Sequence, residues 1–410
     1  MQAKKILLCI SGSIAAYKAI DLASQLHKLG YLVKCVLTEG ATKFVSPLIF
    51  SAITQGSVHT SLFEDNDPIP HIRLADWADL VVIAPATANV IAKAACGVAD
   101  DLLSALLLAY TKPILFIPAM NVNMFAAAST QENLSKLRER GHFFIQPVTG
   151  MLACGYEGKG KYPPNEEILA AIATYLHYKQ DLIGTKVLVT AGATIEPLDP
   201  MRFISNRSSG KMGIALARAL ALRGAEVCLI HANVSVSIPH YLHEAVGCHT
   251  AQEMYNEVMK RYIDMDWIIK CAAVADYYME NINESKLPKT DTLILNLAPT
   301  KDILRELGKL KSPSQKLIGF AAQTDDLIGK ALNKLQQKQL DMICVNNVNT
   351  AGADDTTLTI IGAMKGYPNL AEAPELQHRE VKGDKLSVSH SILDAIVASC
   401  HSCEGRNPAL

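Results

Sequence analysis

Residues 205–230 read SNRSSGKMGIALARALALRGAEVCLI, and they indicate how this part of the chain folds. The alanine- and leucine-rich middle predicts a helix, Gly224 ends it, and the apolar residues that follow predict a strand. Upstream, an apolar strand at Val187–Val189 runs into a glycine turn at Gly192. Strand, helix and strand in this order predict a βαβ unit with an unusually long first loop.

The loop SNRSSGKMG, residues 205–213, looks at first like a phosphate-binding loop. A Walker loop needs a glycine where this chain has Ser205 and a serine or threonine where it has Met212, so that interpretation fails. Anions also bind at the amino ends of helices, where free N–H groups and the helix dipole favour negative charge, and residues 208–210 occupy that position. A serine N-cap followed by a glycine for tight packing explains the same residues equally well.

The composition indicates a globular protein with more than one domain. The chain has 410 residues, an apolar fraction of 49% and a net charge of −1, which provides ample core and no basic surface for nucleic acid. Its ten cysteines are scattered, several of them inside apolar runs, which favours reduced buried thiols over disulfides or zinc sites. No apolar run reaches the ~18 residues of a membrane span. We expect a cytoplasmic protein without nucleic-acid or membrane partners.

Two series of alternating strands and helices divide the chain. The first covers residues 1–178 and has apolar strands such as DLVVIAPA and KPILFIPA; the second covers residues 185–400 and has VLVTA, VCLIH, WIIKCAA, LILNLA, KLIGFAA and MICVNN. Apolar strands separated by helices predict parallel sheets covered on both faces. The polar stretch YKQDLIGTK joins the two series. We therefore expect an α/β protein with two doubly wound, mainly parallel-sheet domains.

Residues capable of ligand binding follow the strands of the first series. Gly12 and Ser13, in SGSIAAYK, lie where a helix begins and could hold a phosphate. Pro85 and Thr87 follow another strand, at the end where α/β sheets bind ligands. Asn121, in PAMNVNMF, follows the next strand, and an asparagine there can cap a helix or bind a carboxylate or amide.

Two side chains of the first series are candidates for proton transfer. His71, in PIPHIRLADWAD, titrates near neutral pH, although single histidines are more often structural. Cys154, in TGMLACGYEGKGK, lies in a glycine-rich loop with lysines nearby, where a thiol can be exposed and its acidity tuned. Cys154 therefore differs from the other nine cysteines.

Taken in order, SGSIAAYK, His71, APATAN, PAMNVNM and the LACG loop resemble the flavin-dependent cysteine decarboxylases over most of residues 1–175. The resemblance implies a flavodoxin-like domain in which FMN oxidises the thiol of a substrate's C-terminal cysteine, so that the neighbouring carboxylate leaves as carbon dioxide. It implies Cys154 as proton donor, Asn121 as the group that holds the carboxylate, and His71 as the active-site histidine. The FMN-binding residues that it implies are Gly12, Ser13, Thr38, Pro85, Thr87 and Ser104.

TAGATIEPLDPMRFISNRSSGKMG, CAAVADY, KLPK, GFAAQT and KALNKLQQKQLDMICVNN resemble the phosphopantothenate–cysteine ligases over residues 185 to about 395. With the decarboxylase in front, the whole chain resembles the bifunctional coenzyme A biosynthesis family. The resemblance implies a Rossmann-like domain that uses CTP and Mg²⁺ to convert the carboxylate of 4′-phosphopantothenate into an acyl-cytidylate, which the amine of cysteine attacks. It implies Asn206 at the acyl group and Asp276 at the nucleotide and the metal. The CTP-binding residues that it implies are Ala273, Asp276, Lys286, Thr300, Lys301, Asp302, Ile303, Phe320, Lys334 and Lys338.

Several of these positions also have simpler explanations or depart from the family. Lys334 and Lys338 are four residues apart on a predicted helix and face one side of it, which is also typical of a solvated helix face. ESKLPKTDT, residues 284–292, predicts an exposed loop. Ile195 stands where the family often has arginine, APTKDIL where it usually has an Asn-Pro-Asp-Ile stretch, and Gln323 where it has an acid. These departures, which include Thr300, leave the nucleotide preference open.

The family resemblance also implies assembly. Its members form trimers of the flavin domain with FMN at the subunit boundary, dimers of the ligase domain, and a dodecamer when both domains are present. The alternative is a flavin-binding regulatory protein without catalysis. The attached ligase half and the presence of Cys154, Asn121 and His71 argue against it. A dehydrogenase with two NAD-binding domains is disfavoured because no GxGxxG follows any strand.

Overall fold

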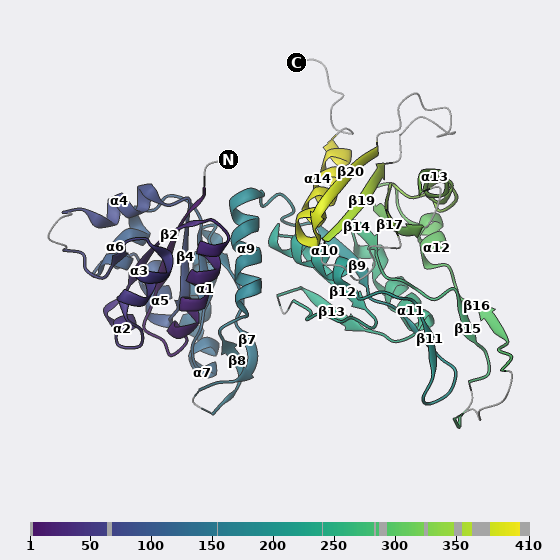
Figure 1. Ribbon diagram of the computed structural model, residues 1–410, viewed down its shortest axis with the longest axis horizontal. Helices are drawn as coiled ribbons and strands as arrows, with labels where there is room; N and C mark the ends of the chain where they lie inside the picture. The colour runs from purple at the N-terminus through teal and green to yellow at the C-terminus, as the bar shows by residue number, and fades with distance from the viewer. Residues whose placement is uncertain are drawn as a thin grey trace, which may run out of the picture. The chain divides into compact units, whose positions relative to one another are not determined.

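The chain folds into two compact units, Met1–His177 and Tyr178–Leu410 (Figure 1). No helix in the part of the chain that the structure describes is long and apolar enough to cross a membrane. The structure, a computed structural model, describes residues 3–63, 68–153, 155–239, 241–282, 284–286, 293–323, 327–347, 355–362 and 378–401.

The first unit is built on a six-stranded parallel sheet with the order β3-β2-β1-β4-β5-β6. The strand β4 is buried along its whole length, as expected for a sheet covered on both faces. Without the two-residue edge strand β3, the order is the flavodoxin-like 2-1-3-4-5, which confirms the expected fold class. The strands are β1 (Lys5–Ile10), β2 (Leu32–Leu37), β3 (Val58–His59), β4 (Leu80–Ala86), β5 (Ile114–Pro118) and β6 (Phe143–Phe144).

Helices and a hairpin complete this unit. Polar side chains begin several of the helices: Thr38, Ser46, Thr87, Asp101 and Asn121 each accept a hydrogen bond from a backbone N–H in the first turn. The antiparallel hairpin comprises β7 (Val148–Met151) and β8 (Glu157–Lys161). The helices are α1 (Ala16–Lys28), α2 (Glu39–Thr42), α3 (Pro47–Thr54), α4 (Pro70–Trp77), α5 (Ala88–Cys96), α6 (Leu102–Ala109), α7 (Val122–Ala126), α8 (Ala128–Glu139) and α9 (Asn165–His177).

The second unit is built on an eight-stranded sheet with the order β13-β12-β9-β14-β17-β18-β19-β20. Its first six strands are parallel and follow the Rossmann order 3-2-1-4-5-6, whereas β19 and β20 are antiparallel. This confirms the expected Rossmann-like, mainly parallel architecture. The strands are β9 (Lys186–Ala191), β12 (Glu226–His231), β13 (Glu244–Gly247), β14 (Trp267–Lys270), β17 (Lys316–Gln323), β18 (Met342–Asn347), β19 (Asp355–Gly362) and β20 (His378–Asp384).

Among the described residues of the second unit, two small hairpins and six helical segments accompany the sheet. In Figure 1, α14 lies beside β19 and β20, and its apolar residues share a core with those of α10. The hairpins pair β10 (Ile195–Pro197) with β11 (Phe203–Ser205) and β15 (Tyr277–Met279) with β16 (Leu297–Pro299). The helices are α10 (Lys211–Leu222), α11 (Ala251–Arg261), the 3₁₀ turn η1 (Tyr262–Asp264), α12 (Ile303–Leu310), α13 (Leu327–Gln337) and α14 (Lys385–His401).

The structure corrects one predicted strand of the second series. LILNLA was expected in the sheet, but only its end forms part of the short strand β16, which pairs with β15 outside the sheet. Leu293 and Ile294 are exposed, so the apolar run does not contribute to the core. The prediction also missed β13, β19 and β20.

A buried arginine fastens the start of the second unit to α14. Arg223, which is 2% exposed, donates two hydrogen bonds of 2.8 and 2.6 Å to Asp181 and one of 2.7 Å to Asp394. Burial acts to raise the pKa of Asp181, but hydrogen bonds and the charge of Arg223 lower it below its ordinary value. The stability contributed by this pair is therefore present above the ordinary carboxylate pKa and is lost as the pH falls below it.

Replacing Arg223 with methionine should lower the free energy of unfolding of the second unit by about 2–3 kcal/mol, because two partly buried carboxylates lose their cation. The chain has two tryptophans, Trp77 in α4 and Trp267 in β14. Urea denaturation followed by Trp267 fluorescence in a Trp77→Phe background therefore reports on the second unit. Arg305→Met, at an exposed position of α12, is the control. Equal midpoints for the two variants would contradict the assigned role.

Candidate active sites

A cavity of about 450 Å³ lies in the first unit, at the amino end of α1 and the carboxyl ends of β4 and β5. This is the edge at which parallel α/β sheets bind ligands. Four of the predicted residues line it: Gly12, Ser13, Thr87 and Asn121. The other lining residues are Ile14, Ala15, Tyr17, Lys18, Ala119, Met120, Met124, Met151, Leu152, Ala153, Gly160, Lys161 and Tyr162.

Local backbone geometry positions these four residues. A Cβ on Gly12 would lie 2.8 Å from the carbonyl carbon of Gly40, so the close approach of the two loops requires glycine. The Ser13 hydroxyl accepts a hydrogen bond of 3.2 Å from an N–H at the start of α1. Thr87 and Asn121 begin α5 and α7, and the Asn121 side-chain oxygen accepts a bond of 2.8 Å from the N–H of Asn123. Asn121 thus caps a helix at the edge of the cavity.

Four further predicted residues of this half that the structure describes, Thr38, His71, Pro85 and Ser104, do not line this cavity. Thr38 caps α2, and the Pro85 carbonyl accepts a 2.7 Å hydrogen bond from the hydroxyl of Ser11. Ser104 is buried and forms a capping box at the start of α6. His71 lies in α4, where its Nδ1 atom is buried without a hydrogen-bond partner among the described residues.

Cys154 lies outside the described residues, but the segment that leads to it reaches the cavity. Met151, Leu152 and Ala153 all line it. The loop that carries the thiol therefore begins at the cavity wall.

Two lysines and a tyrosine in this cavity were not predicted. Lys18, Lys161 and Tyr162 line it, and the Lys18 ammonium lies 5.4 Å from the centre of the Tyr162 ring. Burial lowers the pKa of Lys18, and the charge of Lys161 lowers it further. Lys18 could have been found, because it ends the quoted motif SGSIAAYK and lies one helical turn from the predicted phosphate position.

A second cavity, of about 470 Å³, lies in the second unit at the carboxyl ends of β14 and β17. Asn206 lines it together with nine of the ten predicted nucleotide-binding residues, the exception being Lys286, which is exposed on its loop. Lys270, Ala272, Val274, Ala275, Leu304, Ala321 and Ala322 complete the lining. Residues far apart in the sequence are therefore gathered around one space.

Hydrogen bonds hold the loops around this cavity together. The Asn206 side-chain amide donates to the carbonyl of Val274 over 3.0 Å, which joins the loop after β11 to the loop after β14. The Thr300 N–H donates to the carbonyl of Asp276 over 2.9 Å, and the Thr300 hydroxyl donates to that of Ala275 over 2.6 Å. These bonds fix the backbone on which Asn206 and Asp276 are carried.

The cavity is rich in charged groups. Lys338, one residue beyond the end of α13, binds Asp302 over 2.8 Å, and Asp302 also caps α12. Burial lowers the pKa of Lys334, and the charge of Lys338 lowers it further. Burial acts to raise the pKa of Asp302, but its hydrogen bonds with Lys338 and the N–H of Arg305, together with the charges of Lys338 and Lys270, lower it below its ordinary value. The cavity thus contains several lysines, and Asp302 forms an ion pair with one of them, Lys338.

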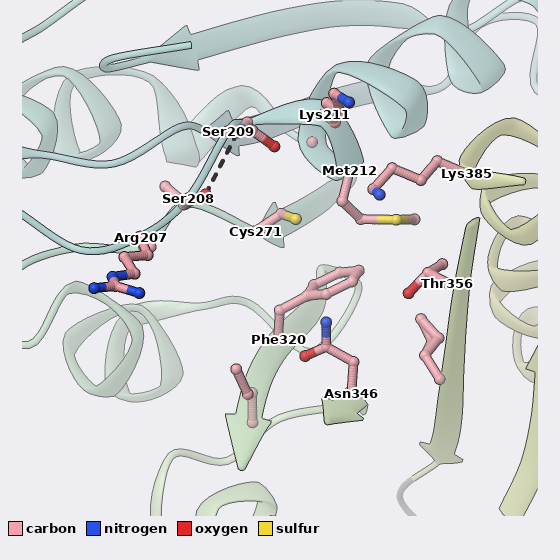
Figure 2. Close-up of a pocket in the computed structure, with 17 residues that line it drawn as sticks. Arg207, Ser208, Ser209, Lys211, Met212, Cys271, Phe320, Asn346, Thr356 and Lys385 are labelled. Atoms are coloured by element: carbon pink, nitrogen blue, oxygen red, sulfur yellow. Dashed lines mark hydrogen bonds between the residues drawn. The ribbon is translucent and has the colours of Figure 1, made fainter. Parts of the chain in front are cut away.

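A smaller cavity of about 200 Å³ adjoins this one (Figure 2). Residues 207–213 form one wall of this smaller cavity. Figure 2 shows the ring of Phe320 lying between Met212 and Asn346. Ala272, Ala273 and residues 320–322 line both cavities, so the two share one wall.

The structure of residues 207–213 tests the alternative explanation of this loop, a serine N-cap followed by a glycine for tight packing. The N-cap of α10 is Gly210, in a left-handed conformation (φ +73°) and without a side-chain cap, so the predicted serine N-cap is wrong. The Ser208 hydroxyl instead accepts a 3.4 Å hydrogen bond from the N–H of Gly210. The glycine for tight packing is confirmed at Gly210, whose Cβ would lie 2.5 Å from Cγ1 of Val234, and Gly213 packs as closely, 2.6 Å from the Cβ of Ala191.

Lys270 was missed because it lies inside an apolar strand, WIIK, where the sequence pattern indicates only core. It is 9% exposed and lines the larger cavity. A charged residue in the last position of a buried parallel strand was the available signal, because that position lies at the ligand-binding edge.

Comparison with known proteins agrees with this division of the chain. The Flavoprotein family matches residues 1–177, and the DNA/pantothenate metabolism flavoprotein C-terminal domain family matches residues 182–399. The coenzyme A biosynthesis bifunctional protein CoaBC of Bacillus subtilis (strain 168) is 43% identical over 405 residues, which cover 96% of this chain and 97% of the relative. That of Haemophilus influenzae is 42% identical over 366 residues, covering 88% and 91%.

Solved structures match each half separately. The crystal structure of the C-terminal domain of a coenzyme A biosynthesis bifunctional protein CoaBC has 32% sequence identity and a TM-score of 0.45, and covers 54% of this chain and 98% of that one. The FMN-dependent cysteine decarboxylase SpaF has 31% identity and a TM-score of 0.38, and covers 43% and 95%. Given the near-full-length identity to the curated relatives, the chain belongs to the family of bifunctional coenzyme A biosynthesis proteins.

Proposed function

We propose that this protein catalyses two consecutive reactions of coenzyme A biosynthesis. Residues 185–400 join 4′-phosphopantothenate to cysteine with consumption of CTP, and residues 1–178 then decarboxylate the product to 4′-phosphopantetheine. The observation that carries the proposal is the cavity over β14 and β17, in which Asn206 and nine residues predicted to bind CTP converge.

The ligase reaction needs an activated carboxylate, because a free carboxylate is a poor acyl donor. The carboxylate of 4′-phosphopantothenate attacks the α-phosphorus of CTP, the bond to the β-phosphate breaks, and pyrophosphate leaves; the cysteine amine then displaces CMP. Lys301, Lys334 and Lys338 provide positive charge for the phosphates. The Asn206 amide provides a hydrogen-bond donor for the acyl oxygen, and Phe320 a surface for the base.

The loop at the start of α10 provides a second set of anion contacts. Residues 208–213 line the smaller cavity at the amino end of a twelve-residue helix, where the helix dipole favours negative charge. Since this cavity shares the wall formed by Ala272, Ala273 and residues 320–322 with the larger one, we propose that the two bind parts of the same reacting substrates.

Magnesium fits this arrangement through Asp276. Mg²⁺ is commonly held by one or two carboxylates together with substrate phosphates and water. Asp276 is exposed at the larger cavity, close enough to affect the pKa of Lys334. We propose that it contacts the metal that accompanies CTP.

The cavity of the first unit fits FMN in size and donors. Its volume of about 450 Å³ falls within the usual range for cofactor sites, and Gly12 and Ser13 bring backbone N–H groups of the α1 terminus to its wall. FMN, when bound there, supplies the two-electron chemistry at the carbon that bears the thiol. Asn121 holds the substrate carboxylate, and Cys154 delivers the proton to the product carbon. Thr38, Pro85, Thr87 and Ser104 are the further proposed FMN-binding residues.

We further propose that the protein acts in the cytoplasm as a homo-oligomer, with trimeric flavin domains, dimeric ligase domains and a dodecamer as the complete assembly. His71 and Ser104 lie outside the cavity of their own chain. Since α4 and α6 carry them, a second copy that presents these helices would bring both residues to FMN.

One incubation tests the whole proposal. The purified protein is mixed with 4′-phosphopantothenate, cysteine, Mg²⁺ and either CTP or ATP, its visible spectrum is recorded first, and products are followed by mass spectrometry. We expect a flavin spectrum and CTP-dependent 4′-phosphopantetheine. A flavin spectrum without product in either nucleotide would instead support the flavin-binding regulatory alternative.

Replacing Cys154 with serine should slow decarboxylation by about a hundredfold or more, since a positioned acid is lost, while ligation continues. The measurement is the accumulation of 4′-phosphopantothenoylcysteine and its oxidised decarboxylated product. Cys96→Ser, which removes an exposed thiol of the same half, is the control. A normal rate of 4′-phosphopantetheine formation by Cys154→Ser would refute the role.

Replacing Asn206 with aspartate should reduce amide formation by about a hundredfold, because the donor to the acyl oxygen is replaced by an anion. Decarboxylation of supplied 4′-phosphopantothenoylcysteine should remain normal, which shows that the first half is intact. The ligation rate is measured by CMP release. An unchanged rate would count against Asn206.

A further inference from the structure

Lys270 occupies an unusual place at the floor of the larger cavity. Along β14, Trp267 and Ile269 pack into the core shared with α10 and α14, whereas Ile268 packs into the core shared with α12 and α13. Alternation along the strand places Lys270 on the same face as Ile268, at the carboxyl end. Its side chain lines the larger cavity together with Lys334 of α13.

The ammonium of Lys270 is poorly satisfied by protein. Its one hydrogen bond to another described residue is long, 3.4 Å to the carbonyl of Ala272. The carboxylate of Asp302, whose charge acts on Lys270, already accepts from Lys338 and from the backbone N–H of Arg305. A buried cation with so few partners is costly unless an anion completes its surroundings.

The other charges of the cavity do not provide that anion. Lys301, Lys334 and Lys338 line it with Lys270, opposite Asp276 and Asp302, so cations outnumber carboxylates. A site of this composition attracts a polyanion.

We propose that the Lys270 ammonium binds a phosphate group of a substrate, and so acts as a further phosphate-binding residue of the ligase site. The inference rests on the proposed function. The phosphate can belong to the nucleotide or to 4′-phosphopantothenate, and separate titrations with the two ligands distinguish these sources.

Phosphate binding at Lys270 has a consequence for pH. Burial and then the charge of Lys338 lower the pKa of Lys270 to about 8. The charged and titratable groups around it are Asp302 at the start of α12, Lys334 and Lys338 at the end of α13, Cys271 on its own strand, and Cys248 after β13. A bound phosphate favours the charged form, so it raises this pKa and draws in a proton. Affinity should therefore fall as the pH rises above about 8.

The test compares the intact protein with three variants. Lys270→Met removes the charge but keeps the length of the side chain, Lys270→Arg keeps the charge, and Lys309→Met alters an exposed lysine of α12 as control. Isothermal titration with Mg²⁺–CTP, and separately with 4′-phosphopantothenate, is carried out at pH 7 and pH 9. We expect Lys270→Met to weaken binding of one ligand by about tenfold or more at pH 7.

Three further results complete the expected outcome. Lys270→Arg retains most of the affinity, Lys309→Met behaves as the parent, and the affinity of Lys270→Met no longer falls between pH 7 and pH 9. The ligand whose binding weakens identifies the phosphate. Thermal unfolding of ligand-free Lys270→Met should have an equal or higher midpoint, because a poorly paired buried charge is removed.

Two results would overturn the proposal. In one, Lys270→Met binds both ligands with parent affinity and the same pH dependence. In the other, its unfolding midpoint falls by many degrees and Lys270→Arg does not restore binding, which identifies a structural role. If the parent protein binds CTP and 4′-phosphopantothenate, either result leaves the proposed function standing; if the parent binds neither, both proposals fail.

Discussion

Parallel strands can be joined only by chain that crosses back over a face of the sheet, and this constraint brings the loops after the strands to one edge. In the second unit, the start of α10 and the residues after β14 and β17 meet in this way. Close backbone approaches hold the arrangement. A Cβ on Gly213 would lie 2.6 Å from that of Ala191, and one on Gly308 would lie 2.0 Å from the carbonyl oxygen of Lys338. The second approach holds α12 against the end of α13, and so keeps Lys338 beside Asp302.

The fold class could be predicted because buried parallel strands are apolar along their whole length. The same rule failed at LILNLA, since an apolar run does not require burial, and Ile294 is 80% exposed in the structure. It also missed β20, HREVKGD, because an edge strand with mostly exposed residues carries polar side chains. Whether each of these two segments joins the sheet depends on the strand with which it pairs. One stretch of sequence does not show that partner.

Prediction of the candidate sites depended on the family pattern more than on single residues. Lys334 and Asp302 alone could be helix-surface residues, and only the cavity explains why they lie together. Thr38 and Ser104 illustrate the opposite case, since Thr38 caps α2, Ser104 belongs to the capping box of α6, and neither lines the cavity of its own chain. Lys270 could not be recognised by periodicity, because periodicity identifies which face of β14 is buried and not which buried position borders a cavity.

The two cavities of the second unit suggest how the substrates of the proposed ligase meet. Alternation along β14 directs Lys270 to the face covered by α12 and α13, and Cys271 to the face covered by α10 and α14. Only the strand-end residues Ala272, Ala273 and 320–322 border both spaces. A carboxylate and an α-phosphorus that arrive from opposite faces can approach each other only at this border. Asn206 is bonded to Val274 in the wall of the larger cavity, and its amide is the proposed donor to the acyl oxygen.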